Sequence, residues 1–266
     1  MRSTSNPAFR TLPRNQQGQY AGFYTSPAAQ GAAYAPGYPA AGYPQTGTVE
    51  RPMTIDDVIM RTGITLAVAF ATGALTVYFH LYSWALPALI VGLVTSLIII
   101  FKRTPSAPLV LLYSAAEGIL LGAITGLFEM LYPGIAFQAI LGTFGVFAAM
   151  LVVYKTGAVR VTPRLTKWII GATVGVVVVM LADLVIHLFG GDLGIRDGGP
   201  VAIIFSLLVI GIASFNLLLD FDQAENMIRA GMPAKWAWYA AFGLMVTLVW
   251  LYLEILRLLS YFQRSN

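Results

Sequence analysis

The sequence contains no cysteine, few histidines and few charged residues. The absence of cysteine excludes disulfides, thiolate-bound metals, iron–sulfur clusters and cysteine nucleophiles. Only two histidines occur, His80 and His187, far apart in the sequence, so a zinc site built from several histidines is excluded and oxygen atoms remain as cation ligands. Charged residues make up 11% and hydrophobic residues 58% of the chain, against about 25% and roughly 45–50% in an ordinary soluble domain. This composition argues against a soluble globular enzyme.

Motifs that would define other functional classes are missing as well. The net charge is +4, and the basic residues are not gathered into one run with interleaved aromatics, which argues against nucleic acid as a partner. No serine nucleophile elbow and no HExxH motif occur. The acids described below also lack the flanking glycine motif expected of an intramembrane aspartyl protease. We therefore expect a protein that is not an enzyme and has no organic cofactor.

The N-terminal part of the sequence is polar and of low complexity. Residues 15–49 hold no charged residue, and Gly-Tyr-Pro recurs at Gly37-Tyr38-Pro39 and Gly42-Tyr43-Pro44. Such a composition cannot bury enough apolar surface to offset the entropy of ordering. We expect residues 1–52 to form a disordered tail and residues 53–266 to form a separate domain.

The second part predicts an all-α membrane bundle. Thr54 followed by Asp57 predicts a helix N-terminus. A transmembrane helix needs about 20 mostly apolar residues, and seven stretches of the sequence are long enough, at approximately 61–81, 84–101, 107–128, 136–154, 168–189, 200–221 and 238–262.

The distribution of lysine and arginine predicts the orientation. Basic residues lie in the N-terminal arm and in the second, fourth and sixth loops, whereas the other loops are poor in them. Cytoplasmic loops carry the excess of basic residues, so we expect a cytoplasmic N-terminus and, with seven spans, an external C-terminus. Because Arg257 and Arg264 lie near that C-terminus, a re-entrant last helix with six true spans is the alternative.

Acidic side chains inside the spans are the candidate functional residues. A charge at the centre of a span costs roughly 2.5–3.5 kcal/mol on insertion scales, so each such acid is a functional hypothesis. The candidates are Glu117, Asp183, Asp220, Asp222 and Glu254.

Two of these acids have neighbours that bear on their role. Gly118, Gly122 and Gly126 recur every four residues beside Glu117, which predicts close approach of another helix. Glu117 then either bonds to that neighbour in its protonated form or lines a polar path. Asp183 and His187 lie one helical turn apart, which favours a direct pair over a proton relay.

The remaining acids lie in the last two spans. A solvated helix end explains Glu225, and it is one explanation for Asp220 too. Asp222 would face another helix if the helix continues through Ile228. Glu254 is surrounded by apolar residues, and Arg257 at i+3 is its expected ion-pair partner.

Two segments of the sequence resemble a known family. Phe221-Asp222-Gln223 in the sixth span, combined with Leu251-Tyr252-Leu253-Glu254-Ile255-Leu256-Arg257 in the last, resembles the Bax inhibitor family, the transmembrane Bax inhibitor motif proteins, in its bacterial branch. Arg61-Thr62-Gly63 and the segment that begins at Glu117 are also similar to that family. The resemblance covers roughly residues 50–266.

The resemblance implies a pH-sensitive calcium leak in a bacterial plasma membrane. By position, Asp222 and Glu254 would be the carboxylates that share protons and hold calcium, with Glu117, Asp183 and Asp220 as secondary candidates along the ion path. Two nearby carboxylates cannot both ionise cheaply, so such a pair titrates as a unit. Arg61 and Arg257 are the candidate salt-bridge partners.

The spacing of the pair and the role of the tail leave two questions for the structure. A turn at Pro233 would place Asp222 about 16 Å and Glu254 about 30 Å along their helices, so contact between them requires a lopsided turn. The alternative function is a regulatory membrane protein of stress response or membrane-protein quality control that acts through other membrane proteins without ion transport. Deleting residues 1–50 would separate the two functions, because it should abolish a tail-based interaction and leave ion flux intact.

Overall fold

The computed structural model describes residues 51–191 and 193–265, so most of the predicted tail lies outside the described residues. In this part of the chain seven helices are long and apolar enough to cross a membrane, which confirms the predicted all-α, seven-span architecture. They are α1 (Ile55–Tyr78), α2 (Ala85–Lys102), α3 (Ala107–Leu131), α4 (Ile135–Thr156), α5 (Pro163–Leu188), α6 (Pro200–Arg229) and α7 (Ala237–Ser265), with the short 3₁₀ turns η2 (Tyr82–Trp84) and η3 (Ala234–Trp236) before α2 and α7.

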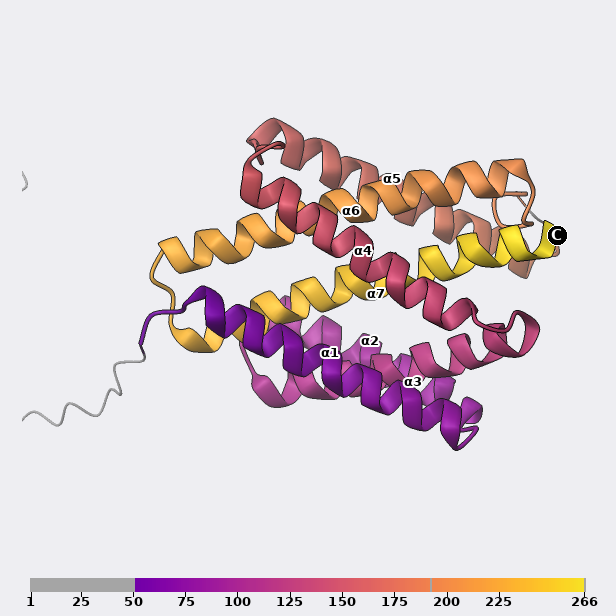
Figure 1. The fold of residues 1–266 in the computed structure, drawn as a ribbon, viewed down its shortest axis with the longest axis horizontal. Helices are drawn as coiled ribbons and strands as arrows, with labels where there is room; N and C mark the ends of the chain where they lie inside the picture. The colour runs from indigo at the N-terminus through magenta and orange to yellow at the C-terminus, as the bar shows by residue number, and fades with distance from the viewer. Residues whose placement is uncertain (1–50, 192, 266) are drawn as a thin grey trace, which may run out of the picture. The chain divides into compact units, whose positions relative to one another are not determined.

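Helix α7 is the centre of the bundle (Figure 1). It packs against α1, α3, α4 and α6, while α2 packs against α3 and α5 lies at the edge on α6. We call the end that carries Arg51 and the α6–α7 turn the N-terminal end of the bundle. The opposite end, which carries the C-terminus of the chain, is the C-terminal end. The acids of α6 and α7 therefore lie on the most enclosed helix pair.

The helix ends follow the local signals in the sequence. Thr54 and Asp57 form the predicted cap, in which each side chain accepts the backbone N–H of the other residue. Helix α6 continues to Arg229, beyond the predicted limit at residue 221, so the long helical arm expected after Asp222 is present. Helix α7 is continuous over Ala237–Ser265, which favours seven spans over the re-entrant alternative.

The glycines of α3 bring it very close to α1, as their spacing predicts. A Cβ atom at Gly118 would lie 2.3 Å from the carbonyl oxygen of Ala69, and one at Gly122 would lie 2.5 Å from that of Gly73. Such contacts are possible only without side chains. In lipid, where helices gain little from the hydrophobic effect, close backbone packing is a main source of helix association.

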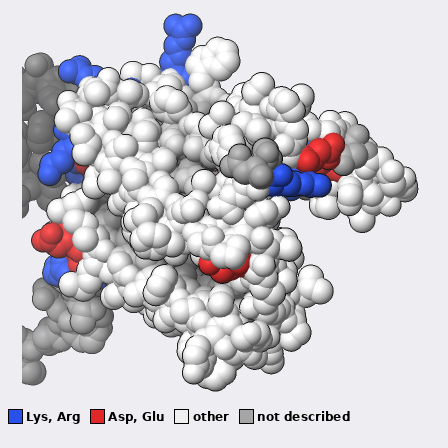
Figure 2. Space-filling view, turned by 45° about the vertical axis from the view of Figure 1, so that its right-hand side comes forward, with Lys and Arg blue, Asp and Glu red and all other residues white. Residues whose placement is uncertain are grey.

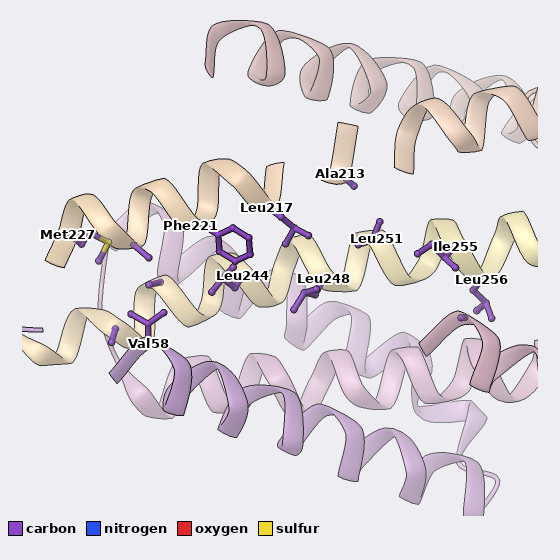
Figure 3. Close-up of a cluster of buried hydrophobic side chains, with 14 of the residues drawn as sticks. Val58, Ala213, Leu217, Phe221, Met227, Leu244, Leu248, Leu251, Ile255 and Leu256 are labelled. Atoms are coloured by element: carbon purple, nitrogen blue, oxygen red, sulfur yellow. The ribbon is translucent and has the colours of Figure 1, made fainter. Parts of the chain in front are cut away.

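The main core lies between α6 and α7 (Figure 3). Leu217 of α6 and Leu251 of α7 are fully buried there, and Phe221 and Leu244 pack nearer the N-terminal end. Large apolar side chains such as Phe70, Leu86 and Val178 are exposed on the outside of the bundle. Figure 2 shows a largely white surface with most of its charged side chains toward the two sides of the view. This distribution fits a bundle whose sides contact lipid and whose ends contact water.

Candidate functional site

The site begins with Glu254, which α7 buries in the bundle. Its side chain is 2% exposed, and Arg257 Nη1 donates to Glu254 Oε1 at 2.7 Å. The i,i+3 spacing on one helix brings these two side chains together. The other carboxylate oxygen, Oε2, is buried and has no hydrogen-bond partner among the described residues. A buried carboxylate oxygen in this state is suited to accept a proton, a water molecule or a cation.

A second carboxylate faces α7 from α6, and it belongs to Asp220. Thr247 Oγ1 donates to Asp220 Oδ2 at 2.5 Å. Gly243 lies beside it, since a Cβ there would be 3.7 Å from Asp220 Oδ1. Thr247 and Glu254 are seven residues apart, so they share one face of α7 and differ in depth by about 10 Å.

Asp222 lies elsewhere on α6. Its carboxylate accepts a bond of 2.9 Å from Asn226 Nδ2. It lines a pocket of about 410 Å³ between α6 and the start of α5, where Thr166 and Ile170 form part of the opposite wall. Because Asp220 and Asp222 are two residues apart, they point to nearly opposite sides of the helix, and Asp220 is the one that bonds to α7.

The structure does not bring Asp222 and Glu254 together. The bond between Asp220 and Thr247 sets the register of the antiparallel helices α6 and α7. From that register, Asp222 lies toward the N-terminal end and Glu254 toward the C-terminal end, about 13 Å apart along the bundle axis. This separation is close to the difference in depth that the sequence spacing predicts. The turn is therefore not lopsided enough to pair them.

Apolar side chains fill the α6–α7 interface between Asp220 and Glu254. Leu217 and Leu251 are fully buried there. Figure 3 shows their side chains between α6 and α7, whereas Leu248 points away from α6. Asp220 and Glu254 are therefore two separate polar sites with an apolar layer between them.

A further polar cluster lies at the C-terminal end. Asp183 of α5 pairs with Arg196 at 3.6 Å, and the Tyr261 hydroxyl of α7 donates to the Arg196 carbonyl oxygen at 3.2 Å. The side chain of His187 is exposed. Arg196, from the loop before α6, is therefore the ion-pair partner of Asp183 that sequence spacing did not identify, because the contact is not local.

The remaining candidates are Glu117, which lies apart from α6 and α7, and Arg61, which contacts the α6–α7 turn. Glu117 is half-buried between α3 and α2, where its Oε1 lies 3.4 Å from the position of a Cβ on Gly92. Arg61 does not reach Asp222. It donates to the carbonyl oxygen of Ala234, in the α6–α7 turn, and lies 5.5 Å from the ring centroid of Trp238.

Several residues of the polar network around α6 were not predicted from the sequence. Asn216 Nδ2 donates to Thr173 Oγ1 at 2.8 Å, which joins α6 to α5. Tyr154 of α4 donates to Glu225, which also pairs with Arg229. Asn216 lies four positions before Asp220, and this spacing could have indicated a polar face on α6.

Among the described residues there is no group of three or more histidine, cysteine or acidic residues that could hold a metal ion. Asp222 and Glu254, the predicted calcium ligands, also lie too far apart to share one ion in this arrangement. A calcium ion at either acid would need other oxygen ligands, from hydroxyls, carbonyls or water.

The fold and these acids define a polytopic helical membrane protein with ionisable side chains inside its bundle. The model of the Bax inhibitor 1-like family matches residues 6–264, and the chain belongs to that family. The match reaches further toward the N-terminus than the resemblance over residues 50–266. A search of curated proteins finds no match to the chain.

Proposed function

We propose that the protein is a pH-sensitive, calcium-permeable leak whose path follows the interface of α6 and α7. The observation that carries the proposal is Glu254, a carboxylate that is 2% exposed and has one buried oxygen without a hydrogen-bond partner among the described residues. A buried acid is costly in a membrane, and a structural ion pair with Arg257 accounts for only one of its two oxygens.

The order of the acids along the bundle supports a path. Asp220 lies at the α6–α7 contact and Glu254 lies about 10 Å deeper along α7. Asp222 lies outside this interface, in the pocket between α6 and α5. The cluster of Asp183 with Arg196 stands at the C-terminal end. Oxygen ligands in series suit a hard cation, which must bind weakly enough at each site to leave again.

The positions of Asp220 and Glu254 also support a resting state that is closed to ions and opening that depends on protons. Leu217 and Leu251 separate Asp220 from Glu254, so ions would pass only after α6 and α7 move apart at that level. Protonation of Glu254 would remove the charge that holds Arg257 at 2.7 Å. Proton binding would thus change both the cation site and a contact within the bundle.

The basic residues at the N-terminal end of the bundle support a cytoplasmic N-terminus. Six of its basic residues lie at or near the ends of α2, α4, α5 and α6, namely Lys102, Arg103, Lys155, Arg164, Lys167 and Arg229, and Lys235 lies in η3 before α7. Cytoplasmic loops retain such an excess. Protease digestion of the tail in sealed inverted and right-side-out vesicles tests this orientation.

Calcium flux into dye-loaded proteoliposomes between pH 6 and 8 tests the function. The wild type should show pH-dependent flux, and Glu254→Gln should remove most of the pH dependence. Asp220→Asn should change the rate at every pH. The matched control is Glu129→Gln, because Glu129 lies on α3, outside the α6–α7 interface, and accepts backbone N–H bonds at the start of α4. Flux equal to that of empty liposomes across the whole pH range would refute the proposal.

The regulatory function stays the second candidate because of the apolar layer at Leu217 and Leu251. A bundle that never opens at this level would act only through partners in the membrane or through residues 1–50. Capture of a membrane protein by the full chain, lost on deleting residues 1–50 while flux is absent in both, would favour this function.

A further inference from the structure

The segment that enters the membrane domain is tied to the α6–α7 turn by backbone bonds. Met53 N donates to Met232 O at 2.8 Å, and Ala234 N donates to Arg51 O at 2.9 Å. These bonds flank an antiparallel bridge between Pro52 and Pro233. Since proline has no N–H, the residues on either side of each proline make the bonds. The segment thus forms a two-sided contact with a turn that follows it by about 180 residues in the sequence.

Side chains reinforce the same contact. The carbonyl oxygen of Ala234 accepts from Arg61, whose guanidinium also lies over the ring of Trp238. Met53 is 2% exposed and belongs to the core cluster that includes Met227 of α6. The segment therefore contacts the end of α6, the turn and the start of α7.

Asp57 connects the two arginines of this contact. Arg51 donates to both oxygens of Asp57, at 2.8 and 2.6 Å, and Arg61 lies 4.0 Å from it. Because of the Asp57 carboxylate, the pKa of Arg51 is raised above its ordinary value. Both backbone groups of Ala234 are consequently held by residues that converge on one carboxylate: its N–H by Arg51 and its carbonyl by Arg61.

We infer that Arg51, Asp57 and Arg61 form a clasp, which holds α6 and α7 together at the N-terminal end and is released when the Asp57 pairs break. The α6–α7 turn contains Gly231 in a left-handed conformation with φ of 64° and passes through Pro233 into η3, so its position depends on contacts with other elements. The side chain of Arg51 is 62% exposed. The pair of Arg51 with Asp57 is therefore accessible from the water-exposed end of the bundle. This inference does not require that the protein conducts ions.

Hydrogen exchange of the full-length protein in lipid nanodiscs tests the clasp. Asp57→Asn keeps the size of the side chain and a cap for α1 but removes the charge. Bonds to charged groups contribute enough that we expect exchange at Met53 and across residues 230–238 to become about ten- to hundredfold faster. The matched control is Asp56→Asn, one residue earlier in the same helical turn, where the side chain is exposed. Its exchange should equal that of the wild type.

A second variant and a distance measurement complement the exchange experiment. Arg51→Gln, at an exposed side chain, should reproduce the effect if Asp57→Asn folds poorly. Since the sequence has no cysteine, spin labels at Met60→Cys and Gln223→Cys can report the distance between α1 and α6. We expect a broader distance distribution in Asp57→Asn and Arg51→Gln but not in Asp56→Asn. Unchanged exchange in Asp57→Asn and Arg51→Gln, or equal acceleration in every helix including α3, would overturn the inference.

Discussion

Replacing Gly118 by alanine should destabilise the bundle, because α1 leaves no room for a side chain at this position. An added Cβ would lie 2.0 Å from Thr72 Oγ1 and 2.3 Å from the carbonyl oxygen of Ala69. The threonine hydroxyl can rotate away, but the carbonyl belongs to the backbone of α1. Relief of the second contact therefore requires the two helices to separate.

The size of the effect follows from that distance. Ordinary contacts of a Cβ atom begin at 3.4 Å, so α1 and α3 must move apart by about 1 Å along most of their contact. Overpacking of this kind costs about 1–3 kcal/mol. Alanine is favoured over glycine in a helix by about 1 kcal/mol, which offsets part of the cost. We expect a net loss of up to about 2 kcal/mol in the free energy of unfolding.

The assay is reversible unfolding in mixed micelles, followed by tryptophan fluorescence. Gly145→Ala is the matched control, since it makes the same change within α4 and an added Cβ meets no atom within 4 Å. It should leave the stability unchanged or raise it slightly. If Gly118→Ala proved as stable as Gly145→Ala, the close packing of α1 on α3 would be refuted.

Two smaller changes test the polar contacts of α7. Thr247→Val should destabilise by about 1–3 kcal/mol, because it leaves the partly buried Asp220 carboxylate without its hydroxyl donor. Thr156→Val, at an exposed threonine bonded only within its own helix, is the control in the same unfolding assay, and equal losses would contradict the prediction. Tyr252→Phe should cost about 1 kcal/mol, because it removes the bond of 2.7 Å to Thr125. A loss within error of zero would show that water replaces this bond.

The sequence predicts the architecture well because each signal is local. Apolar length alone defines seven spans, Thr54 and Asp57 mark the first helix end, and the four-residue glycine repeat marks the closest helix contact. Each depends on residues within one helix or one turn. None requires knowing which helix is the partner.

The site is less predictable because it depends on the relative position of two helices. A motif identifies Asp222 as the acid of the sixth span, yet the acid that bonds to α7 is Asp220, two residues earlier. A helix turns by about 200° over two residues, so a local pattern without the partner cannot decide between them. The link of Asp183 to Arg196 is unpredictable for the same reason, since a loop brings the arginine back.

The clasp and the separation of the acids together constrain how the site can work. A shared proton needs two carboxylate oxygens within roughly 3 Å, whereas Asp222 and Glu254 are about 13 Å apart in depth, or more than two helical turns. Sliding α6 along α7 by that amount would break the bond of Asp220 to Thr247 and every backbone bond of the clasp. A proton held between Asp222 and Glu254 would therefore need a rearrangement of α6 against α7 that breaks both sets of contacts.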